Sequence, residues 1–235
     1  MRIGGRVVSQ GVLIVSAIRC DGKREILGIQ IADTESEATY NELFLDLKAR
    51  GLSGVLLVVS DAHKGLKKAA KRYFQGASWQ RCQVHFSGNA MGLVKRAKRK
   101  EVAADLKKIF TADEKAEARR LASETITKWQ EISPKVAELI DEHIEECFSS
   151  LDFPDSIRPR IRSTNGLERF HEEVRRRTRV VRIFPNRESC LRLISAICIE
   201  HSEEWISGKR YVNPEDLAES RAAQEQQQRD LAAVT

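Results

Sequence analysis

Gly54-Val-Leu-Leu-Val-Val-Ser-Asp61 is a continuous apolar run that ends in a carboxylate. Residues 55–59 are all Val or Leu, which predicts a strand buried on both faces, inside a sheet covered by helices. Asp61 stands where this strand ends and where a helix over 62–74 is predicted to begin. Ligands and metals bind at strand ends along the rim of an open α/β sheet. Asp61 therefore has two interpretations: a ligand at this rim, or an N-cap of the next helix, a common role for Asp.

The segment before this run predicts a hairpin followed by a helix. Two runs rich in β-branched residues flank Asp21-Gly22, a pair typical of a type I′ hairpin turn. Thr34 and Glu37 form a capping box, and the helix after it is expected to end at Gly51. Its predicted core residues are Ala38, Leu43, Phe44 and Leu47.

A further strand is predicted over 78–84, ending in Cys82-Gln-Val-His85. The order β-β-α-β-α-β indicates a mixed sheet with helices packed on it. A sheet of this kind requires a strand before Arg6, where only five residues stand, so the chain is expected to begin late.

Composition favours an anionic partner and a reducing compartment. Lys and Arg number 40 against 34 Asp and Glu, an excess of six positive charges. The five cysteines are odd in number and scattered without a Cys-x-x-Cys pair, a pattern typical of reduced cytoplasmic proteins. No apolar run approaches the ~20 residues that a membrane span needs, and no apolar signal region begins the chain. We expect a cytoplasmic protein with no membrane partner.

From residue 88 to about 150 the apolar residues recur with helical period. Helices are predicted over 93–110, 113–129 and 134–148, which indicates a helical insertion rather than a continued sheet. The first helix carries the basic cluster Lys95-Arg96-Ala-Lys98-Arg99-Lys100. A solvated helix face and a phosphate contact both remain open for this cluster.

A second carboxylate lies in Ser163-Thr-Asn-Gly-Leu-Glu168, which begins another helix. Asn165 can cap this helix and Glu168 follows three residues later, so a capping box is one interpretation of Glu168. At about 100° per residue, the apolar and the polar residues separate onto two faces. The core stripe contains Leu167, Phe170, Val174 and Val181, and the polar stripe contains Glu168, Glu172, Arg175 and Arg179.

Arginine is concentrated around this helix, with nine arginines and three glutamates between Arg158 and Arg182. Two acids far apart in sequence, Asp61 and Glu168, beside an arginine-rich helix suggest metal-assisted phosphoryl chemistry on nucleic acid. Carboxylate oxygens suit Mg²⁺, which also binds substrate phosphates.

Four motifs follow one another along the chain: Val58-Val-Ser-Asp61-Ala-His-Lys-Gly-Leu66, Trp79-Gln-Arg-Cys82-Gln-Val-His85-Phe86, Ser163-Thr-Asn-Gly-Leu-Glu168-Arg-Phe170 and Arg177-Thr-Arg-Val-Val-Arg-Ile-Phe-Pro-Asn186. In order and spacing they resemble the Mutator-type DDE transposases of bacterial insertion sequences, from about residue 6 to residue 217. The resemblance implies an α/β fold of the ribonuclease-H-like kind: a mixed sheet with flanking helices, interrupted by an all-helical insertion. It also implies Mg²⁺- or Mn²⁺-dependent DNA cleavage and strand transfer at insertion-sequence ends, and a homo-oligomer in the complete enzyme.

The family uses an Asp, Asp and Glu triad, and Asp61 and Glu168 match the second and third acids. The first acid lies on a first strand upstream of Arg6, so the resemblance implies an N-terminally truncated fragment, inactive alone. Asp21 in the hairpin turn and Asp33 at a helix start are poor substitutes for this acid. A late annotated start, a frameshift and a decayed element remain alternative origins.

The other predicted site residues have binding or supporting roles. Arg175, Arg176, Arg179 and Lys64 are predicted to contact DNA. A Cys-x-x-His pair offers two soft ligands where zinc wants about four, so Cys82, His85 and Asn165 are predicted to support the site rather than bind metal.

The predicted division of the chain is 1–87 and 161–212 for the catalytic domain, 88–160 for the helical insertion, and 213–235 for a flexible tail. A non-catalytic DNA-binding or partner-binding remnant is the alternative function. A small cellular nuclease of the same fold is a third.

Overall fold

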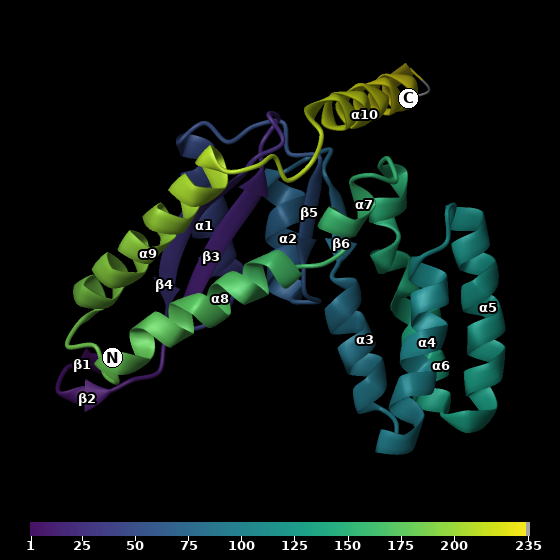
Figure 1. Cartoon of the computed structure of the whole chain (residues 1–235), viewed down its shortest axis with the longest axis horizontal. Coiled ribbons are helices and arrows are strands. Elements are labelled where there is room, and N and C mark those ends of the chain that lie inside the picture. The colour runs from purple at the N-terminus through teal and green to yellow at the C-terminus, as the bar shows by residue number, and fades with distance from the viewer. Residues whose placement is uncertain (234–235) are drawn as a thin grey trace. The chain divides into compact units, whose positions relative to one another are not determined.

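The computed structural model describes residues 1–233 and divides into two compact units, each built from separate stretches of the chain (Figure 1). The first unit contains Met1–Val55, His63–Gln75 and the chain from Asn165 onward. The second unit contains Leu56–Ala62 and Gly76–Thr164. Helices and strands occur in both units, so the predicted mixed α/β class is confirmed at this level.

The described strands form three separate two-stranded ladders rather than one continuous mixed sheet. Two ladders are antiparallel and belong to the first unit; the third is parallel and belongs to the second. The prediction of one mixed sheet is therefore wrong. Residues with high β-propensity favour extended backbone, but they do not specify which strands pair with each other. The strands are β1 (Arg2–Ile3), β2 (Arg6–Val7), β3 (Gly11–Ile18), β4 (Arg24–Ala32), β5 (Leu57–Ser60) and β6 (Ser78–Arg81).

The first unit is organised on the β3–β4 hairpin, whose register runs from Gly11 opposite Ala32 to Ile18 opposite Arg24. A bulge falls where Val15 pairs with Gly28 and Ser16 pairs with Ile26. Because the bulge inserts one extra residue into β4, the side-chain alternation is reset there. Ile26, Ile29 and Ile31 can then all pack into one core, which they do.

The hairpin loop differs from the predicted type I′ turn. Arg19 N–H donates to the Lys23 carbonyl at 2.8 Å, and Gly22 N–H donates to the Arg19 carbonyl at 2.9 Å. Gly22 has a φ of +80°, whereas Asp21 is not among the residues with positive φ. The loop is therefore a three-residue connection that ends in a left-handed glycine, the second common way to close a hairpin.

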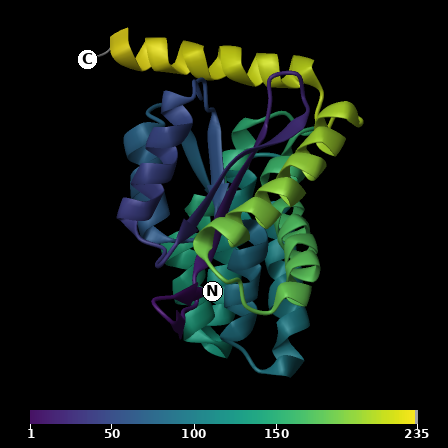
Figure 2. The same ribbon diagram turned by 90° about the vertical axis from the view of Figure 1, so that its left-hand side faces the viewer.

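Helices cover both faces of this hairpin. On one face, Ile14 and Ile31 pack with Phe170 and Val174 of α8 and with Ile194 of α9. Helix α9 lies along the hairpin in both views (Figures 1 and 2). On the other face, Gly28 lies against Leu43 and Leu47 of α1, where a Cβ would be in tight contact. The helices of this unit are α1 (Glu37–Ala49), α2 (Lys64–Tyr73), α8 (Asn165–Thr178), the 3-10 turn η4 (Arg179–Val181), α9 (Arg187–Ser207) and α10 (Pro214–Ala233).

Helix α1 ends as predicted, and its N-cap lies two residues after the predicted one. Ser36, not Thr34, is the N-cap, and its hydroxyl accepts from Thr39 N–H at 3.3 Å. At the other end Gly51 has a φ of +98°, and its N–H bonds back to the Lys48 carbonyl, which closes the helix. Three predicted core residues are buried, but Ala38 is exposed and Tyr40 is buried in its place.

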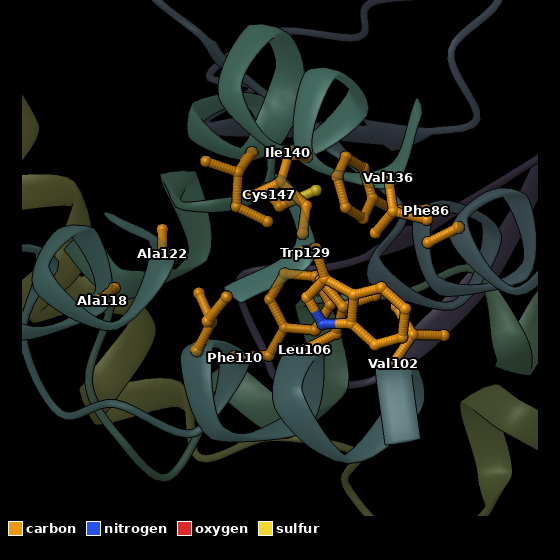
Figure 3. Close-up of a cluster of buried hydrophobic side chains, with 14 of the residues drawn as sticks. Phe86, Val102, Leu106, Phe110, Ala118, Ala122, Trp129, Val136, Ile140 and Cys147 are labelled. Atoms are coloured by element: carbon orange, nitrogen blue, oxygen red, sulfur yellow. The ribbon is translucent and has the colours of Figure 1, made fainter. Parts of the chain in front are cut away.

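The second unit is a helical block joined to the β5–β6 ladder. Its core gathers around the fully buried Trp129, with Phe86, Leu106 and Val136 among its neighbours (Figure 3). The segment from 88 to 160 is helical, as its apolar period predicts. Its helices are α3 (Gln83–Gly92), η1 (Arg96–Lys98), α4 (Arg99–Phe110), α5 (Lys115–Ile132), α6 (Pro134–His143), η2 (Ile144–Cys147), η3 (Ser149–Asp152) and α7 (Arg158–Ile161).

Gln80 of β6 fixes the ladder to this block. Its side-chain amide donates to the Cys147 carbonyl at 2.8 Å, and its carbonyl accepts from Ser150 N–H at 2.8 Å. Arg81, only 5% exposed, pairs with Glu146 at 3.2 Å. Buried polar groups are retained where such bonds satisfy them, so β5, β6 and the helical block fold as one body.

Residues Pro214–Ala233 form helix α10, in the segment that the sequence predicts to be a flexible tail. Across residues 1–233, no helix combines the length and the apolar character that crossing a membrane requires.

Candidate functional site

Asp61 lies at the end of β5 and is exposed. The residue before it, Ser60, is buried and forms three hydrogen bonds. Its hydroxyl accepts from Trp79 Nε1 at 2.9 Å and donates to the Asp61 carbonyl at 2.8 Å, and its own carbonyl accepts from Cys82 N–H at 2.7 Å. The backbone that carries Asp61 is therefore fixed from both strands of the ladder. The strand is half-buried and begins at Leu57, so burial on both faces over 55–59 was wrong.

The N-cap of α2 is His63 rather than Asp61. Its Nδ1 accepts from Leu66 N–H at 3.3 Å, which satisfies one donor at the start of the helix. The capping interpretation of Asp61 is therefore wrong. A histidine is an uncommon cap, so the sequence offered no signal for it.

Cys82 and His85 lie at the junction of β6 and α3. The strand ends at Arg81, so the predicted strand over 78–84 is too long, and His85 lies within α3 rather than at a strand end. Cys82 is fully buried, and its Sγ accepts from Thr164 N–H at 3.4 Å and from Thr164 Oγ1 at 3.3 Å. These bonds join the end of β6 to the segment directly before α8, and the supporting role of Cys82 stays a prediction.

Glu168 lies in the first turn of α8 and is half-buried. Asn165, predicted to cap this helix, is its first residue. The predicted core stripe is confirmed for Phe170 and Val174, which are 3% and 7% exposed. Leu167 is partly buried, and Val181 lies beyond the end of the helix, in η4.

His171, a residue that no sequence motif indicated, lies on α8 together with Glu168 and Arg175. Burial lowers its pKa, the positive charge of Arg175 lowers it further, and the carboxylate of Glu168 acts in the opposite direction. Its Nε2 is buried without a hydrogen-bond partner among the residues described. These surroundings favour the neutral imidazole of His171, which lies between Glu168 and Arg175 along the helix.

The arginines from Arg175 in α8 to Arg179 in η4 separate into paired and unpaired groups. Glu173 accepts from Arg176 at 2.7 Å and from Arg177 at 2.6 Å, and these bonds lower the pKa of Glu173 to about 2. Arg175 and Arg179 are exposed and form no ion pair within the described part of the chain. Of the three arginines predicted to contact DNA, Arg176 is thus occupied within its own helix, and the other two are oriented to solvent.

Lys64, the fourth predicted DNA contact, is the first residue of α2 and is exposed. It heads a run of basic residues along this helix in the first unit. One member of the run, Lys68, pairs with Glu37 at 3.4 Å.

The two predicted metal ligands belong to different units. Asp61 lies in the second unit and Glu168 in the first. Their pairing around a metal stays a prediction.

Comparison with known proteins identifies similar chains. The family described as "Transposase, Mutator family" matches residues 1–208. The transposase for insertion sequence element IS406 of Burkholderia multivorans is 45% identical over 214 residues, 91% of this chain and 55% of the relative. The transposase for IS1081 of Mycobacterium tuberculosis is 40% identical over 95% of this chain and 54% of the relative. The transposase for IS256 in transposon Tn4001 of Staphylococcus aureus is 39% identical over 91% and 55%.

The chain spans about half the length of the curated relatives it matches. The match covers nearly all of the present chain, including both acids and the arginines of α8.

Proposed function

Because the chain belongs to the Mutator family of transposases, we propose that it carries catalytic residues for divalent-metal-dependent DNA cleavage and strand transfer at insertion-sequence ends. Asp61 and Glu168 are the proposed metal ligands. One observation carries the assignment of Asp61: His63 caps α2, so the cap does not explain an acid at this strand end. The ribonuclease-H-like fold and a homo-oligomeric complete enzyme are parts of the same proposal.

The donor chemistry of the two residues fits Mg²⁺ or Mn²⁺. Both side chains offer carboxylate oxygens, the ligands preferred by hard divalent cations. Each stands at an end of a regular element, Asp61 after β5 and Glu168 in the first turn of α8. When bound, the metal would activate the attacking oxygen and stabilise the leaving oxygen.

The protein's own residues position the DNA and the acids. Ser60 and Trp79 hold the backbone of Asp61, and Cys82 and Thr164 hold the chain that leads into Glu168. Arg175, Arg179 and Lys64 would hold phosphates. The guanidinium groups of the two arginines suit bidentate contact, and the ammonium of Lys64 adds a point charge.

The chain of 235 residues, assayed by itself, should turn over DNA slowly. Two carboxylates hold two divalent ions poorly, because the excess positive charge on the metals is left uncompensated. The two acids weighed as substitutes for the first acid of the triad are engaged elsewhere: Asp21 accepts from Lys23 N–H at 3.0 Å, and Asp33 accepts from Gln10. Robust turnover that is abolished by Asp61→Asn would overturn this expectation.

Titration with Mn²⁺, followed by electron paramagnetic resonance, tests the metal assignment. Asp61→Asn and Glu168→Gln should each weaken binding by at least about tenfold, the size of effect seen even for residues that act through a metal ligand. Asp113→Asn and Glu131→Gln are matched controls, because both acids are exposed and lie in the helical block. Equal Mn²⁺ affinity in the wild type, the two variants and the two controls would refute the proposed metal site. DNA binding retained without Mn²⁺ binding would favour the non-catalytic alternative.

A further inference from the structure

The helical block of the second unit carries balanced charge that is unevenly distributed. Residues 88–160 contain fourteen basic and fourteen acidic residues, so the block has no net charge from these groups. Five of the basic residues fall within 95–100, a stretch with no acid. The block therefore has a strongly positive edge, balanced by acids elsewhere on its surface.

Outside this stretch, basic residues of the block are mostly engaged by acids. Arg119 and Glu145 form a two-bond pair at 2.7 and 3.1 Å, and Arg120 binds Glu117 in the same way at 2.8 and 2.7 Å. Further pairs within the block include Lys115–Asp152, Lys128–Asp105, Lys128–Glu101, Lys108–Asp105, Arg158–Asp155 and Arg120–Glu124.

Within 95–100, only Lys98 forms an ion pair that involves a described residue, with Glu101 at 2.8 Å. Lys95, Arg96, Arg99 and Lys100 are exposed. Glu101 and Asp105, the nearest acids in sequence, already bind Lys128 at 3.0 and 2.6 Å. Glu101 and Asp105 thus bind Lys98, Lys108 and Lys128, and the other four residues of the cluster keep their positive charge without an ion pair among the described residues.

The cluster continues along the solvent face of α4. Val102, Leu106 and Ile109 are fully buried and define the core side of this helix. At about 100° per residue, Lys100 and Lys107 point the opposite way, and both are exposed. We call Lys95, Arg96, Arg99, Lys100 and Lys107 the α4 basic surface.

We propose that the α4 basic surface contacts the phosphate backbone of duplex DNA. This inference rests on the proposed function and adds a contact region, in the helical block, to Arg175 and Arg179 in the other unit. Like charges placed so close together repel one another, and an anionic partner removes that repulsion. Duplex DNA supplies regularly spaced phosphates that can meet several of these side chains at once, with release of bound counterions. Such contacts position the DNA without reading its sequence.

Salt titration of a fluorescent duplex tests the proposal on the full 235-residue chain. Arg96→Gln/Arg99→Gln removes two charges from the α4 basic surface. Arg119→Gln/Arg120→Gln removes two charges from paired arginines of the same block and is the matched control. Circular dichroism and thermal melting establish that both variants are folded.

The α4 variant should reduce the magnitude of the slope of log K against log [salt] by about 1.8, since each phosphate contact contributes about 0.9. The control variant should keep the wild-type slope. Equal slopes for wild type and the α4 variant would overturn the inference and would leave an acidic protein as the partner to test. Because this slope reports phosphate contacts and Mn²⁺ titration reports the acids, failure here is distinguishable from failure of the proposed metal site.

Discussion

The guanidinium of Arg177 on α8 donates two hydrogen bonds to the carboxylate of Glu200 on α9, at 2.5 and 3.2 Å. A third bond from Arg177, to Glu173 at 2.6 Å, links the pair back to α8. These bonds raise the pKa of Arg177 and lower those of both glutamates. The arginines of α8 and η4 thus have different surroundings: Arg176 and Arg177 form ion pairs within the fold, whereas Arg175 and Arg179 are exposed to solvent.

Arg175→Ala/Arg179→Ala should weaken duplex binding and reduce the magnitude of the salt slope by about 1.8, if each side chain contacts one phosphate. Arg176→Ala is the control, and it should change the slope little because Glu173 already occupies this guanidinium. Fluorescence anisotropy at several salt concentrations measures both. Binding should not depend strongly on duplex sequence, because phosphates carry no base information. An unchanged slope in the double variant, or sharp preference for one duplex, would contradict this assignment.

Gly22→Ala should destabilise the first unit more than Gly51→Ala does. Both glycines have positive φ, +80° and +98°, so each substitution costs ~1–2 kcal/mol of backbone strain. The Gly22 carbonyl accepts from Tyr211 N–H and Val212 N–H, which holds the hairpin loop against residues 211–212. A Cβ at Gly22 would therefore also overlap the carbonyl oxygen of Val212. At Gly51 no atom lies within 4 Å of the added carbon. Chemical denaturation of the two variants measures the difference, and equal losses would show that the hairpin loop is not held against 211–212.

Trp129→Ala should destabilise the helical block by about 3–5 kcal/mol, the range for truncating a fully buried aromatic residue. Trp129→Phe should cost less, because it keeps most of the apolar volume. It still removes the indole N–H that donates to Asp105 at 3.0 Å. Burial raises the pKa of Asp105, but bonds from Lys128 and Trp129 outweigh it, so the net pKa is lowered. Guanidinium denaturation of both variants measures these losses, and two small effects would mean that the core around Trp129 is not packed as described.

Lowering the pH from about 7.5 to about 5.5 should destabilise the protein through His171. Burial and Arg175 place its pKa in the folded chain below the ordinary value of 6.5. As the pH falls below about 6.5, the unfolded chain therefore takes up the proton first, which favours unfolding. His171→Leu should lose less stability than the wild type over this range.

Glu173→Gln is the control for the histidine prediction. The pKa of Glu173 is about 2 in the folded chain, so its contribution to stability is present above about pH 4.5 and is lost only as the pH falls toward 2. Between pH 7.5 and 5.5 the control should therefore follow the wild type. Thermal melting at both pH values measures the three proteins, and identical pH dependence in His171→Leu would refute the role of His171.

The sequence determined the features that depend on neighbours along the chain. Helical period placed the elements of the helical block, and the stripe through Phe170 and Val174 identified the buried face of α8. A left-handed glycine ended α1 at Gly51, because few other residues adopt that conformation. These local patterns also carried the family resemblance that the comparison confirmed.

Only the tertiary structure decided which partners meet. Ser36 rather than Thr34 caps α1, and His63 rather than Asp61 caps α2. In each case several nearby side chains could have served, and packing of the helix selected one. Glu200, which holds Arg177, stands 23 residues away on another helix, where no local period could reveal it. Periodicity and charge can be read along the chain, whereas hydrogen bonds and ion pairs form between atoms that folding brings within about 3 Å. For this reason the sequence indicated the buried faces and the charged residues, but not the hydrogen-bond and ion-pair partners of those residues.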